Sequence, residues 1–171
     1  FMDGPWLGVH LSSTPNLRYG PLVSVGREPT PRPGRDTRLM PVIGAFAGYK
    51  LLHNLTVNVH GHRMAGSRGT AMIDAQLVSY NSLAPHHALG VALGLRLVDR
   101  RYLQAHFWAG PEASAGVKDV YLGGRWHWEL NPKYELVTGL ELQRLQGDAA
   151  TSPRTARRNS STSFVMLLYR Y

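Results

Sequence analysis

Two histidines and an aspartate stand where a metal site or a polar network could form. In LTVNVHGH, residues 55–62, His60 and His62 are two positions apart, so they share one face if the segment is a strand. Asp74 follows in the next alternating segment. Two imidazoles and a carboxylate can ligate a divalent metal. The same groups also form the hydrogen-bonded network that a polar interior needs. We predict the network, with no metal and no other cofactor.

A second group has the residue types used in ester hydrolysis. Ser79, Ser82, His86 and His87 are close together in the sequence. Nucleophilic catalysis needs a serine within hydrogen-bond reach of a base that a third group orients. No acidic residue stands beside these four, although another segment could supply one. A lipid A-modifying esterase is therefore the least favoured function, and we predict that the protein is not an enzyme.

Long alternating segments must position these residues. In ALGVALGLRLV, residues 88–98, the side chains of Leu89, Leu93 and Leu95 share one face, and Gly94 and Arg96 share the other. If the leucines face lipid, Leu93→Arg should be costly and Gly94→Ala should matter less. The same alternation predicts about ten strands, with eight or twelve as alternatives. Their ranges are 5–13, 19–26, 38–50, 52–63, 69–80, 86–98, 102–109, 117–129, 134–146 and 161–171.

The polar faces of these segments carry charge, histidine and glycine. Such strands close either into a soluble barrel with an apolar interior or into a membrane barrel with an apolar exterior. Aromatic residues near the strand ends favour the membrane barrel, because Trp and Tyr prefer the headgroup interface. These aromatics are Trp6, Trp108, Trp126, Trp128, Tyr134, Tyr169 and Tyr171. We therefore predict one all-β domain over residues 1–171, an antiparallel transmembrane β-barrel with a polar lumen in a bacterial outer membrane.

The last strand carries a second signal for a membrane barrel. SFVMLLYRY, residues 163–171, alternates apolar side chains and ends on an aromatic residue. This pattern resembles the C-terminal signal that the barrel assembly machinery reads. We predict that Leu167, Tyr169 and Tyr171 form that signal, and that this strand closes the barrel against the first one, around residues 6–12. Closure is needed because unpaired backbone groups cost several kcal/mol each in hydrocarbon.

Loop lengths give a provisional orientation. Residues 99–101 and 131–133 are interpreted as short periplasmic turns, and the loops near 80–86, 109–116 and 147–160 as extracellular. Two connections conflict with this scheme. It places the long segment 27–37 in the periplasm and the tight segment 51–54 outside. Short turns are expected on the periplasmic side, so the scheme breaks that rule near the N-terminal end of the map.

Charge indicates the partners. The net charge of +8 favours anionic partners. We predict that Arg154, Arg157 and Arg158, in the last long loop, contact lipopolysaccharide phosphates. No nucleic-acid recognition module appears, so nucleic acid is not an expected partner. The polar residues expected inside the lumen are His60, His62, Asp74, Gln76, Arg96, His106, Asp119, Arg125, His127, Glu129 and Glu141.

Several stretches of the chain resemble the MipA/OmpV family of outer-membrane proteins, also called the MltA-interacting protein family. YGPLVSVGRE resembles the family's GP-then-GR segment, and VDRRYLQAHFWAG resembles its DDRYMQAYFGV segment with Arg100 in place of the second Asp. AGVKDV matches an AGLKDV segment, LQGDAATSP an LLGDAADSP segment, and the terminal YRY a YRF. Family members are longer, so the chain resembles a compact or N-terminally shortened member.

The resemblance implies an outer-membrane barrel without established enzymatic chemistry. One branch of the family is described as a scaffold that joins a murein synthase to a lytic transglycosylase, and others are described as porin-like. We predict an envelope scaffold or interaction protein, with periplasmic murein enzymes as possible partners. The alternative is a narrow porin-like channel for small solutes, although side chains fill most of the interior of a ten-stranded barrel.

Overall fold

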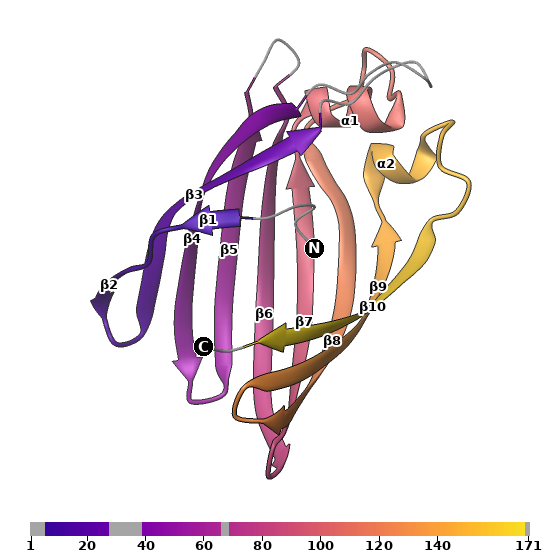
Figure 1. Ribbon diagram of the computed structural model, residues 1–171. Helices are drawn as coiled ribbons and strands as arrows, with labels where there is room; N and C mark the ends of the chain where they lie inside the picture. Colours follow the sequence, from indigo (N-terminus) through magenta and orange to yellow (C-terminus); the bar gives the residue numbers. More distant parts are fainter. Residues whose placement is uncertain (1–5, 28–38, 66–68, 170–171) are drawn as a thin grey trace.

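The protein is a ten-stranded antiparallel sheet that curls into a barrel (Figure 1). The computed structural model describes residues 6–27, 39–65 and 69–169. The strands are β1 (Trp6–Gly8), β2 (Leu11–Thr14), β3 (Leu17–Arg27), β4 (Leu39–Leu52), β5 (Leu55–Met64), β6 (Ala71–Ala84), β7 (His87–Val98), β8 (Gly116–Asn131), β9 (Tyr134–Leu145) and β10 (Asn159–Tyr169). Two helices lie between strands, α1 (Arg100–Phe107) and α2 (Gly147–Thr151). None of the helices in the described residues is long and apolar enough to cross a membrane.

The predicted all-β class and the count of ten strands are confirmed, but two details of the strand map are wrong. The first predicted strand, residues 5–13, is two short strands, because β1 and β2 both pair with β3 and are separated by residues 9–10. The predicted strand over 102–109 lies instead in α1. These two errors cancel in the count. Short apolar alternations such as YLQAHFW are ambiguous, because they also place Leu103 and Phe107 four apart on one helical face.

Because residues 100–107 form a helix rather than a strand, the conflict between loop length and loop position disappears. The tight turns at 15–16, 53–54, 85–86 and 132–133 now fall at one end of the barrel, called here the short-turn end. The connections 99–115 and 146–158 fall at the opposite end, called the long-loop end, together with the end of β3, the start of β4, the end of β5 and the start of β6. Residues 99–101 and 131–133, which were predicted to share one side, lie at opposite ends, and the turn at 85–86 lies at the same end as 131–133. Asn131 shapes the tight turn, because its Oδ1 accepts from the backbone N–H groups of Lys133 at 2.9 Å and Tyr134 at 3.1 Å.

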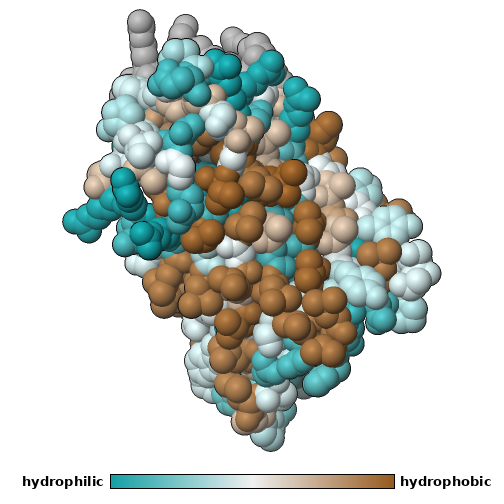
Figure 2. Space-filling model, turned by 180° about the vertical axis from the view of Figure 1, so that it is seen from behind, coloured by the Kyte–Doolittle hydropathy of each residue, from teal (hydrophilic) through white to brown (hydrophobic). Residues whose placement is uncertain are grey.

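The apolar faces of the strands point outward. Leu93 is 60% exposed, whereas Arg96 on the same strand is 4% exposed. Exposed apolar residues occur on every long strand, and Figure 2 shows them gathered in a band across the middle of one face. Leu89 and Leu95 lie on the same face and are partly covered. An apolar belt around a polar interior is the arrangement of a membrane barrel rather than of a soluble one.

In the part of the chain that the structure describes, the sheet has two edges without a strand partner. In the described part of the chain, β1 pairs with β3 and β10 pairs with β9, and no register joins β1 to β10. The predicted seam between the last and first strands is therefore absent from these residues. Leu167 and Tyr169 lie on β10, exposed and opposite Leu136 and Tyr134. Tyr171 lies outside the described residues.

Candidate functional site

A buried arginine organises the interior near the long-loop end. The Arg96 guanidinium, on β7, donates to Asp119 Oδ1 at 3.2 Å and to Glu141 Oε1 at 2.7 Å. Its Nε lies 3.4 Å from Asp74 Oδ2. Gln143 Oε1 accepts a further bond at 3.2 Å. These partners come from β6, β8 and β9, so one side chain ties four neighbouring strands together. We call Arg96, Asp74, Asp119, Glu141, Gln143 and Tyr121 the Arg96 cluster.

Tyr121 covers this arginine. The Arg96 Cζ lies 4.2 Å from the centre of the Tyr121 ring, and the Tyr121 hydroxyl donates to Asp74 Oδ1 at 2.6 Å. The ring fits because Gly94, its cross-strand neighbour, has no side chain. A Cβ at Gly94 would overlap the ring of Tyr121. This glycine therefore makes room for the cluster, so Gly94→Ala should cost less than Leu93→Arg, as predicted, but should not be neutral.

A β-bulge places two consecutive charges inside the barrel. The register between β7 and β8 shifts between Arg96 and Leu97, which leaves Lys118 as an extra residue. Regular alternation would point one of two neighbours outward, but Lys118 and Asp119 are both buried. The Lys118 Nζ lies 2.9 Å from Asp119 Oδ2. Two cations thus offset the three carboxylates of the cluster.

An apolar cap lies over the cluster at the long-loop end. Val98, Leu103 and Ala149 form a buried core between β7, α1 and α2, and Met72 and Phe107 pack against it. Asp99 begins α1, because its Oδ1 accepts from the Tyr102 backbone N–H at 2.7 Å. The carboxylate before an apolar run is the sequence signal that identifies this helix.

The part of the cap around α2 is held in place by hydrogen bonds between side chains and the backbone. The Ser152 hydroxyl donates to the carbonyl of Phe107, which ties the end of α2 to the end of α1. Asp148 Oδ2 accepts from the Ser114 backbone N–H at 3.0 Å, and Thr155 Oγ1 donates to the Ala149 carbonyl at 2.6 Å. Residues from 99–110, 114–120 and 145–155 therefore meet at one place. These are the stretches that carry most of the family resemblance.

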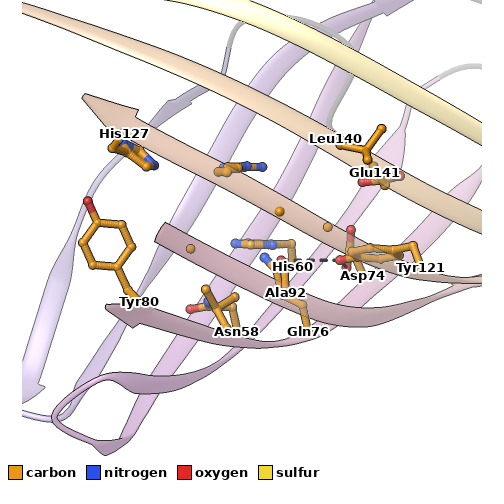
Figure 3. A pocket seen from close by; sticks show the side chains of 15 residues that line it. Asn58, His60, Asp74, Gln76, Tyr80, Ala92, Tyr121, His127, Leu140 and Glu141 are labelled. Carbon is orange, nitrogen blue, oxygen red and sulfur yellow. Dashed lines mark hydrogen bonds between the residues drawn. The ribbon is translucent and has the colours of Figure 1, made fainter. Parts of the chain in front are cut away.

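Two adjoining cavities lie beside the cluster inside the barrel. The first, of about 500 Å³, is lined by the residues labelled in Figure 3, which also shows Tyr121 beside Asp74 on one side and Tyr80 with His127 on the other. The second, also about 500 Å³, lies among β3, β4 and β5 and shares Asn58 and His60 with the first. Arg18 and Lys50 line the second cavity. Small residues, such as Ala92 and Gly123, leave the room that the first cavity occupies.

The structure brings part of the predicted polar network together. Asp74, Gln76, Arg96, Asp119 and Glu141 belong to the cluster or contact it, since the Tyr121 hydroxyl also lies 3.4 Å from Gln76 Oε1. The network prediction omitted three residues that the structure adds. They are Tyr121, Gln143 and Lys118. The inward direction of Tyr121 could have been inferred from the sequence, because Tyr121 is two positions from Asp119 and therefore lies on the same strand face.

The other predicted lumen residues are not members of the cluster. His60 is the cross-strand neighbour of Asp74, and His62 is two positions along the same strand. His127 Nδ1 lies 2.6 Å from Glu135 Oε1 in the short-turn half, and Arg125 lines the first cavity. Glu129 lies 3.7 Å from His86 at the short-turn end. His106 is on α1, stacked on Tyr102 at 4.2 Å between ring centres, so its predicted place on a lumen strand is wrong.

The residues considered for catalysis have other partners. Ser79 Oγ accepts from Asn81 at 2.8 Å. His87 stacks on Trp126 and Trp128, each at 5.6 Å between ring centres. Within the described ranges, no group of three or more metal-ligating side chains could hold an ion.

The three arginines of the last loop have different surroundings. The Arg154 guanidinium lies 4.0 Å above the Trp108 ring, at the end of α1. Arg157 instead lines a groove on the outer surface, together with residues of β7, β8 and β9. Arg158 is exposed, and its carbonyl accepts from the Leu145 backbone N–H at 2.8 Å.

Comparison with known proteins gives one match. The model of the family described as MltA-interacting protein MipA matches residues 1–171, the whole chain. No curated protein and no solved structure matches this chain.

Proposed function

Because this chain belongs to the MipA family, we propose that it is an outer-membrane barrel that acts as an envelope scaffold, binding murein enzymes rather than conducting solutes. The family description names an interaction with MltA. A murein hydrolase of that type is therefore the first partner to test. The short-turn end would face the periplasm, as in other outer-membrane barrels.

The Arg96 cluster and its cap carry this proposal. A general pore needs a water-filled path along its axis, but here buried charged groups and an apolar core occupy the long-loop end beside β6 to β9. Arg96 bonds to three carboxylates in a solvent-poor region, where removal of one partner leaves costly unpaired charge. Such a cluster is suited to rigidity rather than to the passage of ions.

A binding measurement tests the scaffold. Detergent-purified, folded protein is immobilised and exposed to a purified lytic transglycosylase of the MltA type and to a bifunctional murein synthase. We expect concentration-dependent binding of both enzymes, and none to a heat-unfolded sample. If neither enzyme binds to folded protein, the scaffold proposal is wrong.

The second candidate function is a narrow channel, and a different observation supports it. The two cavities share Asn58 and His60 as lining residues, and the second one carries Arg18 and Lys50. A path through these cavities would favour small anions. The two candidates differ in one measurable property, the conductance of the purified barrel.

A further inference from the structure

A groove on the outer wall combines an apolar floor with a basic rim. Its volume is about 920 Å³, toward the upper end of the ~300–1,000 Å³ range typical of small-molecule sites. Leu93, Leu122 and Leu142 form its floor, on β7, β8 and β9, and each is about half exposed or more. The segment between α2 and β10 forms one wall. The floor belongs to the outward apolar belt, so it faces acyl chains if the barrel is in a membrane.

The rim of this groove is cationic. Arg144 and Arg157 both line it, from β9 and from the segment before β10. Ser160 and Ser161 add hydroxyl groups, and no acidic residue is among the lining residues. Over the residues described, neither arginine has a carboxylate partner within ion-pair distance. Guanidinium groups bind phosphate oxygens in bidentate geometry. The groove therefore offers an apolar surface below and phosphate-binding groups above.

We propose that this groove is a binding site for lipopolysaccharide, with acyl chains on the leucine floor and a lipid A phosphate between Arg144 and Arg157. The proposal rests on the outer-membrane placement proposed above, which puts the long-loop end in the outer leaflet. Arg144 and Arg157 lie toward that end of the barrel, since β9 ends at Leu145 and β10 begins at Asn159.

This assignment changes the earlier expectation for the last loop. Arg154 was expected to contact phosphate together with Arg157 and Arg158, but its guanidinium stacks on Trp108. This contact joins the last loop to the end of α1. Arg144 was not expected at all, because in sequence it belongs to a strand rather than to the basic loop. The register of β9 against β8 brings it beside Val120 on the outer wall.

Native mass spectrometry of the folded protein in detergent tests the site. The wild type is titrated with phosphorylated lipid A, with the same lipid without phosphate, and with inorganic phosphate alone. We expect tight binding of phosphorylated lipid A only. The double variant R144Q/R157Q should bind it about tenfold more weakly, as expected for the loss of charge-assisted hydrogen bonds. Heat-modifiable migration on a gel confirms that each sample is folded.

Matched variants distinguish lipid A binding in this groove from nonspecific effects of charge and hydrophobicity. Arg63 is exposed near the long-loop end on β5, so R63Q should bind lipid A as the wild type does. Leu122→Asn should weaken binding, and Leu77→Asn, at an exposed position on β6, should not. Unchanged affinity in R144Q/R157Q, or equal binding of lipid without phosphate, would overturn the proposal. Failure of murein-enzyme capture with intact lipid binding would refute the scaffold alone.

Discussion

The guanidinium of Arg96 on β7 donates a 2.7 Å hydrogen bond to the carboxylate of Glu141 on β9, past the intervening strand β8. Strands that are not neighbours are thus joined inside the barrel. Asp74 on β6 and Asp119 on β8 complete the coordination of the same side chain. This arrangement ties the C-terminal half of the sheet into one unit and occupies its interior near the long-loop end.

Removal of the arginine should destabilise the barrel strongly. In Arg96→Met, three buried carboxylates lose their shared partner, and we expect a loss of about 3–5 kcal/mol in the free energy of unfolding. Urea titration of the protein refolded into liposomes measures this. The control is Arg63→Met, an exposed arginine on β5, for which we expect a change within ~0.5 kcal/mol. Equal stability of the two variants would show that the cluster contributes little.

Gly94→Ala should be destabilising although the change is one methyl group. The added Cβ overlaps the Tyr121 ring and should displace the hydroxyl from Asp74. Overpacking of this kind costs about 1–3 kcal/mol. Gly124→Ala on β8 is the matched control, because a Cβ there meets no atom within 4 Å. The same urea titration compares the two variants, and a neutral Gly94→Ala would contradict the packing described for Tyr121.

Leu93→Arg tests which face meets the membrane. Leu93 lies in the middle of β7 and is 60% exposed on the apolar belt. An arginine near the bilayer midplane costs about 2–4 kcal/mol. Leu83 is 61% exposed beside the tight turn at 85–86, so Leu83→Arg should cost about 0–1 kcal/mol. Comparable folding yields into liposomes for both variants would argue against a lipid-facing belt.

Asp99→Ala should loosen the cap. The substitution removes the acceptor for the Tyr102 backbone N–H, and loss of an N-cap costs about 1 kcal/mol. Hydrogen exchange should become faster across α1 and remain unchanged in β4 and β5. Arg101→Ala, an exposed position on the same helix, is the control. If both variants exchange alike, the Asp99 side chain does not hold the helix.

The strands were predictable because alternation is a direct consequence of strand geometry. The face of Arg96 and Asp74 followed from their positions relative to Leu93 and Ile73. The helix over 100–107 was missed because a short segment fits both periods, and tertiary contacts with α2 decide between them. Asp99 at the N-cap position is the sequence signal for this helix, but the same residue also fits the predicted turn at 99–101.

The partners within the cluster could not be predicted from alternation. Pairing depends on the register and on bulges, and the extra residue Lys118 changes which side chains face inward on β8. The reach from Arg96 to Glu141 crosses one strand and depends on the curvature of the sheet. Neither feature leaves a mark in a single sequence. The same holds for Arg144, which lines the same groove as Arg157 only because the chain folds back after α2.

Single-channel recording in planar bilayers tests the closed interior most directly. With the Arg96 cluster and the α1–α2 cap intact, we expect the folded wild-type protein to insert without steady conductance steps. Heat-modifiable migration of the same sample shows that the protein is folded. Reproducible, steady steps from wild-type protein would contradict the closed interior and favour the channel, whereas their absence together with binding of a murein enzyme is the result expected of a scaffold.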